Sequence, residues 1–306
     1  MIDLIKYFIV NKDKFIKTIE DSDKVDLRMR VNSKTAEISD KRIAHYKSMF
    51  IETTINRATL KGSIHKYFNM IKGYGNQNYN DFSYCDFKYA LNHLQNKFEL
   101  KNNNTNVTNL EFGINIETTQ DPQELIDYYI LMYDYKLPNR NEKFYGKGDY
   151  LEFKTTDYSL KIYNKSKQNS LKNRKILRIE LKITGSRYLK RHFNIFTLKD
   201  LDRIRFKLLF NKLLEHFDKL LVVDDLVLKN HDRMDEMMLF KDGINPNYWK
   251  RLTNSKQREK FKKNFNKVLV NYNLLETKKY LKKLLENKYN ELMNCDCDCD
   301  KFEMVA

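Results

Sequence analysis

The stretch Ile176-Leu-Arg-Ile-Glu-Leu-Lys-Ile-Thr184 alternates apolar and charged side chains over nearly its whole length. Successive side chains of a β-strand point to opposite faces of a sheet, so this period of two predicts a strand with two different faces. Leu177, Ile179, Leu181 and Ile183 form the apolar row, opposite Arg178, Glu180 and Lys182. We therefore expect a sheet that buries one face and leaves the other for polar chemistry.

Other stretches show the same alternation. In residues 110–116 an apolar row of Leu110, Phe112, Ile114 and Ile116 opposes Glu111, Gly113 and Asn115. In residues 159–165, Leu160 and Ile162 oppose Lys161, Tyr163 and Lys165. Residues 26–38 and 45–69 also have strand character, which would place Ser63, His65 and Tyr67 on one side of a long strand. If helices cover the apolar rows, the opposite face collects His65, Glu111, Tyr163, Glu180 and several lysines.

Helical patterns separate these strands. One follows a cap at Ser83 and runs to Phe98, and a second opens at Pro122 and runs to about Met132. Residues 150–153 and 159–165 are expected to pair as a hairpin. The order β–α–β–α–β–β–β predicts an α+β fold, with an antiparallel sheet packed on helices.

The pattern becomes helical after Gly185. Thr197 and Asp200 have the spacing of a capping box, and residues 255–292 form one or two long helices. An apolar stripe follows the capping box, consisting of Leu201, Ile204, Leu208, Leu213, Phe217 and Leu220. We expect an α+β unit over residues 1–190, a basic helical region over 191–293 and a flexible Cys/Asp tail over 294–306.

The formal charge is +16, and it is concentrated in two windows. Residues 158–191 carry eleven Lys or Arg and one acid, and residues 250–283 carry twelve and two, so the remainder is net negative. Two basic blocks on an acidic chain favour a polyanionic partner, although solvated helical faces are the simpler explanation for charge runs. The candidate DNA contacts in these blocks are Arg178, Lys182, Lys260, Lys262, Lys263 and Lys267.

Three of the four cysteines alternate with acids in residues 294–300. This is neither a zinc-ribbon spacing nor a disulfide framework, so we expect a reduced, mobile tail. No apolar run approaches the roughly 20 residues of a membrane span. A cytoplasmic protein without a membrane partner is expected.

The charged face would suit phosphodiester chemistry. The oxygen of Tyr163 can attack a phosphate and form a covalent intermediate, and Lys161 and Lys165 lie at the right parity to favour the phenolate. Glu111, Glu180 and His65 could hold Mg²⁺ or Mn²⁺, and Arg178 could grip a neighbouring phosphate. Simpler readings stay open, because twenty tyrosines occur, a lone histidine is usually structural, and Glu180 could be an ordinary cross-strand ion pair.

Four short motifs resemble the replication initiation factor family of plasmids and filamentous phages, which are rolling-circle replication initiation proteins. The motifs are residues 60–69 with Asn80-Asp-Phe82, residues 109–115, Lys161-Ile-Tyr-Asn-Lys165 with Gln168 nearby, and Leu177-Arg-Ile-Glu180. The resemblance covers roughly residues 55–185. The order and spacing of the four motifs resemble those of the family. Glu111 corresponds to the first acidic residue of the family's strand motif, and Tyr163 corresponds to its tyrosine.

The resemblance implies a nickase-type sheet and a bacterial, metal-dependent site-specific DNA endonuclease and strand transferase. It would cut a double-stranded origin, handle single-stranded DNA, form a 5′-phosphotyrosine through Tyr163 and work with a host helicase. Three departures put the metal ligands in question: no two histidines flank one hydrophobic residue, Asn115 replaces a second acid, and Asn164 replaces an Asp.

Other functions are compatible with the pattern. A non-catalytic DNA-binding replication or transcription regulator would need only the basic helices. A tyrosine recombinase also forms a phosphotyrosine, but no histidine here has Arg three residues later. RNA binding stays open as well, because basic and aromatic residues do not distinguish RNA from DNA.

Overall fold

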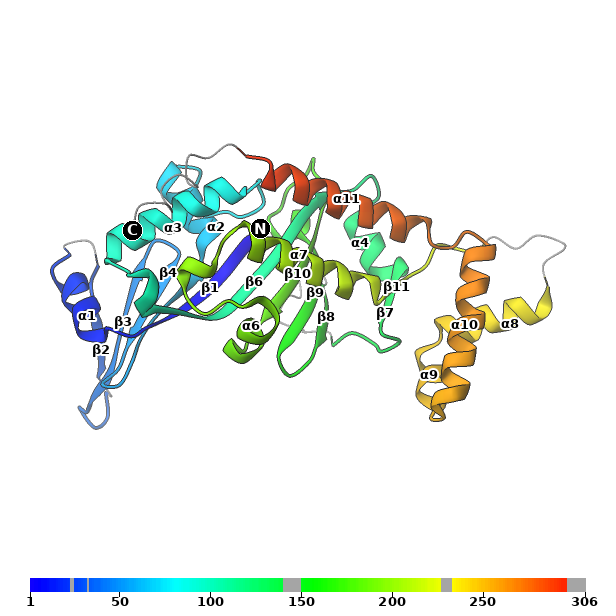
Figure 1. Cartoon of the computed structure of the whole chain (residues 1–306), viewed down its shortest axis with the longest axis horizontal. Coiled ribbons are helices and arrows are strands. Elements are labelled where there is room, and N and C mark those ends of the chain that lie inside the picture. The colour runs from blue at the N-terminus through cyan, green and yellow to red at the C-terminus, as the bar shows by residue number, and fades with distance from the viewer. Residues whose placement is uncertain (23–24, 32, 140–149, 227–232, 296–306) are drawn as a thin grey trace.

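The computed structural model describes residues 1–22, 25–31, 33–139, 150–226 and 233–295. Its centre is a nine-stranded antiparallel sheet with the strand order β2-β3-β4-β5-β1-β6-β10-β9-β8, seen in Figure 1. The strands of this sheet are β1 (Ile2–Ile9), β2 (Arg28–Val31), β3 (Ile38–Tyr46), β4 (Met49–Thr53), β5 (Ala58–Ser63), β6 (Thr105–Glu117), β8 (Tyr150–Lys154), β9 (Tyr158–Asn164) and β10 (Ile176–Ile183). The predicted α+β class and the β8–β9 hairpin are confirmed.

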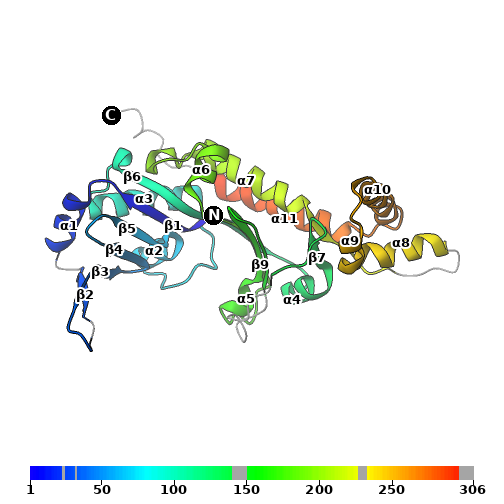
Figure 2. The same ribbon diagram turned by 90° about the horizontal axis from the view of Figure 1, so that it is seen from below.

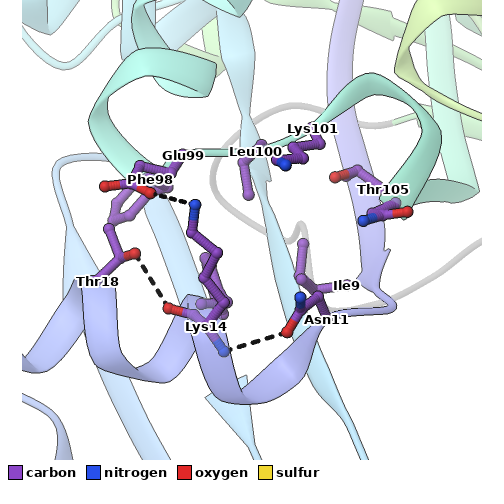
Figure 3. Close-up of a pocket in the computed structure, with 11 residues that line it drawn as sticks. Ile9, Asn11, Lys14, Thr18, Phe98, Glu99, Leu100, Lys101 and Thr105 are labelled. Carbon is purple, nitrogen blue, oxygen red and sulfur yellow. Dashed lines mark hydrogen bonds and ion pairs between the residues drawn. The ribbon is translucent and has the colours of Figure 1, made fainter.

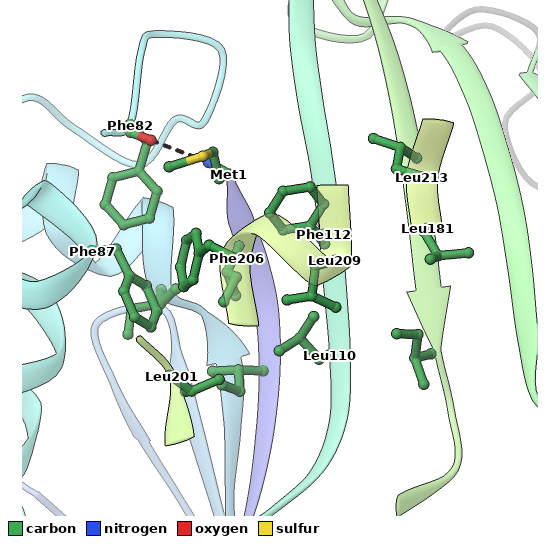
Figure 4. Packing of buried hydrophobic residues seen from close by; sticks show 14 of the residues in the cluster. Met1, Phe82, Phe87, Leu110, Phe112, Leu181, Leu201, Phe206, Leu209 and Leu213 are labelled. Atoms are coloured by element: carbon green, nitrogen blue, oxygen red, sulfur yellow. Dashed lines mark hydrogen bonds between the residues drawn. The ribbon is translucent and has the colours of Figure 1, made fainter. Parts of the chain in front are cut away.

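Helices cover the apolar face of the sheet. They are α1 (Lys12–Glu20), α3 (Tyr84–Phe98), α6 (Ser186–Phe193), α7 (Arg203–Asp218) and α11 (Glu276–Met293). In Figure 4 the ring of Phe206 from α7 packs between the helices and β6, with centroids 5.0 Å from Phe87 and 6.0 Å from Phe112. The apolar rows predicted in residues 110–116 and 177–183 are buried in this core.

The strand predicted through residue 69 ends earlier. β5 stops at Ser63, and residues 64–72 form α2 (Ile64–Lys72). The Ser63 side chain accepts a hydrogen bond from the Lys66 amide at 3.0 Å, as an N-cap does. Ile64, Tyr67 and Phe68 are then buried on one side of the helix. The prediction of a strand carrying His65 was therefore wrong, because the cap and the helical spacing outweigh the local alternation.

The helix predicted from Pro122 to Met132 is also shorter. α4 (Pro122–Glu124) continues into the wide turn η2 (Leu125–Tyr129), and the chain then extends as β7 (Ile130–Tyr133). β7 pairs antiparallel with β11 (Leu220–Val222) in a separate two-stranded sheet. The remaining short elements are η1 (Asn102–Asn104), α5 (Lys165–Gln168) and η4 (Leu198–Asp200).

A second hydrophobic cluster lies beside the main core. It is built by α8 (Met234–Ile244), α9 (Pro246–Arg251) and α10 (Ser255–Asn271), which extend beyond the sheet in Figures 1 and 2. Trp249 is buried there, and its Nε1 donates to the Gly243 carbonyl at 2.7 Å. The predicted division at residue 190 stays a prediction, but α7 and α11 share the core of the sheet.

The capping box at Thr197 and Asp200 is present, and residues 255–292 contain two helices, α10 and α11. The predicted stripe in α7 is partly wrong, since Ile204 and Leu208 are exposed whereas Phe206 and Leu209 are buried.

The expectation of reduced tail cysteines is contradicted at Cys295. This residue forms a disulfide with Cys85 of α3, 210 positions away, across a Cα–Cα distance of 6.2 Å. The tertiary fold brings Cys85 and Cys295 together, which the local spacing of cysteines could not predict. The other cysteines of the predicted tail lie in residues 296–306, outside the described residues.

Candidate active site

The register of β6, β10 and β9 brings the charged rows together. Arg178 lies opposite Tyr163, Glu180 lies opposite Lys161, and Lys182 lies opposite Glu111. Directly opposed residues share a face, so all six side chains belong to the face that helices α3, α7 and α11 leave uncovered. The alternation predicted that Glu111 and Glu180 share this face, and the register of β6 and β10 makes them diagonal neighbours on it.

Glu180 is the centre of this arrangement. Its Oε2 accepts a hydrogen bond from Arg178 Nε at 2.8 Å and one from the Tyr163 hydroxyl at 3.4 Å. Gly113 lies opposite Glu180 in the ladder. A Cβ at Gly113 would lie 2.9 Å from the Glu180 Cβ and 3.1 Å from Arg178 Nη2, so glycine gives these two side chains their room.

Arg178 lies beneath the surface rather than on it. The side chain is fully buried, and its Nη1 donates to Asn115 Oδ1 at 2.9 Å while Nη2 lies 3.7 Å from Asp3 Oδ2. Asp3 in turn accepts from Asn78 Nδ2 at 2.6 Å and from the Ser63 hydroxyl. The expected grip of Arg178 on a DNA phosphate does not fit this burial, because Nε and Nη1 donate to protein oxygens and Nη2 is buried without a hydrogen-bond partner among the described residues.

Tyr163 is half-buried, with its hydroxyl directed at Glu180. Burial, followed by the charge of Glu180, raises its pKa well above the ordinary value, and Arg178 offsets this only in part. The expectation that flanking lysines favour the phenolate is therefore not met in this state. The phenol is neutral, and a base must take its proton before it can attack.

Lys165 differs from its predicted place, because β9 ends at Asn164 and Lys165 begins α5. Its Nζ nevertheless lies 5.5 Å from the centre of the Tyr163 ring and donates to Asn78 Oδ1 at 2.8 Å and Gln168 Oε1 at 3.0 Å. Burial, together with Arg178, lowers the pKa of this buried ammonium to about 8. Lys161 remains on β9, half-buried and opposite Glu180 and Glu152.

Glu111 lies on the same face at the next rung. Its Oε1 pairs with Lys182 Nζ at 3.0 Å. Burial and the nearby Glu180 raise the pKa of Glu111 to about 7, and Lys182 compensates incompletely. The Lys182 side chain keeps about a third of its surface exposed, so it can still meet a ligand.

His65 does not join the two glutamates. It is buried in α2, its Nε2 lies 2.9 Å from Asn80 Oδ1, and its ring stacks on Phe82 with centroids 4.5 Å apart. Burial is the main cause that lowers its pKa to about 3, so the ring is neutral. A role for His65 as a metal ligand stays a prediction that this placement does not favour.

Of the three predicted metal ligands, Glu111 and Glu180 lie on one face of the sheet, and His65 lies apart from them. Within residues 1–295, apart from the gaps given above, no three His, Cys, Asp or Glu side chains are grouped as a metal site. Mg²⁺, however, is often held by one or two carboxylates, with waters and substrate phosphate completing the shell. Glu111 and Glu180 could supply these two carboxylates, each of which is paired with a cation here, and Mg²⁺ or Mn²⁺ binding stays a prediction.

Asp3 and Asn78 complete the network around Arg178 and were not among the predicted site residues, and Ser63 was predicted only as part of a strand. The N-terminal stretch, residues 1–10, is apolar except for Asp3 and Lys6. It is β1, in which Ile5, Tyr7 and Ile9 are buried while Leu4, Lys6 and Phe8 are half-buried on the other face. Strict alternation would place Asp3 with Ile5, Tyr7 and Ile9, but the pairing of β1 with β6 shifts register between Ile2 and Ile5, and Asp3 lies on the polar side near Arg178. No local signal in the sequence predicts this.

The other predicted DNA contacts lie on α10. Lys260, Lys263 and Lys267 are exposed, and Lys262 is half-buried with its Nζ 5.3 Å from the centre of the Tyr135 ring. DNA binding by these residues stays a prediction, but their positions leave them accessible. In the described part of the chain, no helix is long and apolar enough to span a bilayer.

A separate hollow of about 20 Å³ lies between α1 and α3 (Figure 3). The pair Lys14–Glu99, 2.8 Å apart, and the cap from the Lys14 amide to Asn11 Oδ1 at 3.2 Å close it. Its size and internal pairing suit a packing defect between helices rather than a ligand site.

Comparison with protein-family models gives no match for this chain. Comparison with curated proteins gives none either. Among solved structures, the chain is similar to a rolling circle replication initiator protein from Geobacillus stearothermophilus. The identity is 9%, the match covers 77% of this chain and 89% of that chain, and the TM-score is 0.38. A likeness this distant carries no conclusion about function.

Replacing Arg178 with Met should cost about 3–5 kcal/mol of unfolding free energy, because Glu180 and Asp3 would stay buried without their cation. Denaturant titration measures this. Arg28→Met is the matched control, since Arg28 pairs with Asp26 on the surface with 77% of its side chain exposed, and such pairs contribute less than about 1 kcal/mol. Equal losses in both variants would show that the Arg178 network is not the buried centre described here.

The Lys165 ammonium should titrate near pH 8 rather than near its ordinary 10.5. A ¹³Cε-lysine NMR titration measures this, with the resonance assigned by its loss in Lys165→Gln. Because the folded pKa is the lower one, the unfolded state binds more protons between pH 8 and 10.5, and Lys165 should make stability rise with pH in that window. A midpoint above pH 10 would contradict the buried placement.

Proposed function

We propose that this chain is a replication initiator that nicks and rejoins origin DNA through a covalent bond to Tyr163. The observation that carries the proposal is the contact of the Tyr163 hydroxyl with Glu180 Oε2, at 3.4 Å, on a half-open sheet face beside buried cations. A nucleophile within reach of a base, with the base held by a third group, is the arrangement that covalent catalysis requires. Arg178 is that third group.

In the proposed step, the Tyr163 oxygen forms a bond to phosphorus and the bond from phosphorus to the 3′ oxygen breaks. The phenolic proton passes to the Glu180 carboxylate, and the leaving 3′ oxygen takes a proton from solvent. The products are a 5′-phosphotyrosine and a free 3′ hydroxyl. The reverse step rejoins a strand, because the phosphotyrosine conserves the energy of the broken bond.

The charges around Tyr163 suit the transition state. Extra negative charge develops on the phosphate oxygens, and preorganised cations stabilise it. Lys165 lies beside the ring, and Lys161 and Lys182 lie on the same face of the sheet. Glu111 and Glu180 would hold a Mg²⁺ or Mn²⁺ ion, which when bound would neutralise charge on the scissile phosphate.

Binding of the origin duplex is assigned in this proposal to α10. Lys260, Lys263 and Lys267 form an exposed basic surface on a helix outside the sheet. Contacts of this kind to phosphates give strong, salt-dependent affinity. The freed 3′ hydroxyl would prime synthesis, and unwinding ahead of it would require a host helicase.

A second candidate function is a DNA-binding regulator without catalysis. The observation that favours it is the environment of Tyr163, whose pKa is raised and whose partner Glu180 is already paired with buried Arg178. Such a network can be structural alone. The regulator would use the α10 surface in the same way.

Supercoiled DNA that carries the sequence flanking the gene, incubated with Mg²⁺ or Mn²⁺, separates these functions. We expect a nick and a gel-shifted covalent adduct that Tyr163→Phe abolishes while DNA binding is kept. Tyr150→Phe, on the adjacent strand opposite Tyr163, is the matched control and should retain the adduct.

Glu180→Gln should lower the nicking rate by roughly 10²–10⁴-fold, the usual contribution of a general base. If Tyr163→Phe nicks as fast as the parent protein, the nucleophile is assigned wrongly. If no adduct forms with either ion while binding is intact, the regulator is the correct function.

A further inference from the structure

A row of aromatic and basic side chains crosses the sheet outside the candidate active site. His45 of β3 lies opposite Phe50 of β4, Phe50 lies opposite Lys61 of β5, and Lys61 lies opposite Lys6 of β1. Directly opposed residues share a face, so the four form one line perpendicular to the strands. We call this line the aromatic–basic row.

The members of the row contact one another and remain accessible. The His45 and Phe50 rings meet edge to face with centroids 4.9 Å apart, and Lys61 Nζ lies 4.7 Å from the centre of the Phe50 ring. His45 and Lys61 are exposed, and Phe50 and Lys6 are half-buried. Their strand neighbours Ala44, Met49, Ile51 and Leu60 are buried in the core, so the row lies on the opposite, uncovered face.

The row leads directly into the candidate active site. Lys6 and Lys61 line a hollow of about 220 Å³ together with Asn109, Glu111 and Lys182. Glu111 and Lys182 are the outer residues of the site described above. The two surfaces are therefore continuous across β1, β6 and β10.

The charge of the row favours an anionic occupant. In the described chain no carboxylate lies within 4.0 Å of Lys6 or Lys61, although most other charged side chains of the sheet are paired. Glu52, the nearest acid along β4, is already held by Lys41 at 2.7 Å and Arg57 at 3.5 Å. A phosphate would thus meet two lysines that have no ion-pair partner among the described residues, and Glu111, which lines the same hollow, is already paired with Lys182.

We propose that the aromatic–basic row is a track for an unpaired DNA strand, which it delivers to Tyr163. Bases would stack on Phe50 and His45, and phosphates would contact Lys61 and Lys6. Stacking requires the face of an unpaired base, so the row selects single strands over duplex. The proposal rests on the function proposed for Tyr163, and it adds where the cut strand lies.

The length of the track follows from the sheet. Six strand spacings separate β3 from β9 in the order of the sheet. At about 4.8 Å each they span on the order of 30 Å, or roughly nine nucleotides at 3.4 Å per stacked base. A 12-nucleotide strand should therefore fill the track.

The test measures the affinity of a fluorescein-labelled 12-nucleotide oligothymidine by anisotropy, in a Tyr163→Phe background that cannot cleave. Phe50→Leu keeps an apolar side chain but removes the ring and should weaken binding about tenfold, whereas Phe50→Trp should bind at least as well as the parent. A 2-aminopurine base in the same strand should lose its fluorescence quenching in Phe50→Leu. Folding is checked by thermal unfolding of each variant.

Lys61→Gln tests the phosphate contact. It should reduce the slope of log affinity against log salt by about 0.7, the value for one contact to a single strand. Lys17→Gln, an exposed lysine on α1 of the helical layer, removes the same charge and should leave the slope unchanged. Binding of a 12-base-pair duplex should be unaffected by Phe50→Leu.

Unchanged oligonucleotide affinity in both Phe50→Leu and Lys61→Gln overturns the track, as does an equal loss of duplex binding. The function proposed for Tyr163 is scored separately, by adduct formation in proteins that keep Tyr163. If Phe50→Leu still forms an adduct at saturating DNA, the function proposed for Tyr163 is supported independently of the track. If the parent protein binds the strand but forms no adduct, the track is supported and the function proposed for Tyr163 is not.

Discussion

The guanidinium of Arg178 lies fully buried between three strands, and the polar face of the sheet depends on how its charge is satisfied. Nε contacts Glu180 on its own strand β10, Nη1 contacts Asn115 on β6, and Nη2 faces Asp3 on β1. Removing a charge from water costs several kcal/mol, so a buried guanidinium is tolerated only with close, well-aligned partners. That requirement fixes the position of Glu180, and through it the hydrogen bond to the Tyr163 hydroxyl.

The two faces of the sheet then have separate roles. The apolar face packs on α3, α7 and α11 through rings such as Phe206 and Phe112. The other face keeps Glu111, Lys161 and Tyr163 at its β9 side and the aromatic–basic row at its β3 side. Because both sets lie on one continuous surface, a single extended ligand can contact them together. A nucleic-acid strand has that shape and the complementary charge.

Much of this arrangement follows from alternation alone. The parity of residues 110–116, 159–165 and 176–184 predicted which side chains share the polar face, and a period of two cannot be shifted without exposing the apolar row. Parity predicted that Glu111 and Lys182 share a face, and in the structure the two form an ion pair on it. The shared face of Tyr163, Glu111 and Glu180 could therefore be predicted from the sequence. The order of the strands, which decides how close these residues lie, could not.

Other features required the tertiary structure. Residues 64–68 alternate like a strand, but Ile64, Tyr67 and Phe68 also have helical spacing, and the Ser63 cap decides between the two. Asp3 carries no local signal, since its importance arises from Arg178 across two strands. The Cys85–Cys295 contact joins residues 210 positions apart, which no spacing rule addresses. The raised pKa of Tyr163 likewise results from burial that composition does not show.

Peptide mapping of the protein–DNA adduct by mass spectrometry tests the central claim most directly. After the reaction with divalent ion, nuclease trimming and proteolysis should leave a nucleotide on the peptide that contains Tyr163, with fragmentation placing it on that tyrosine. A nucleotide on another residue, such as Tyr150 on the neighbouring strand, would contradict the account.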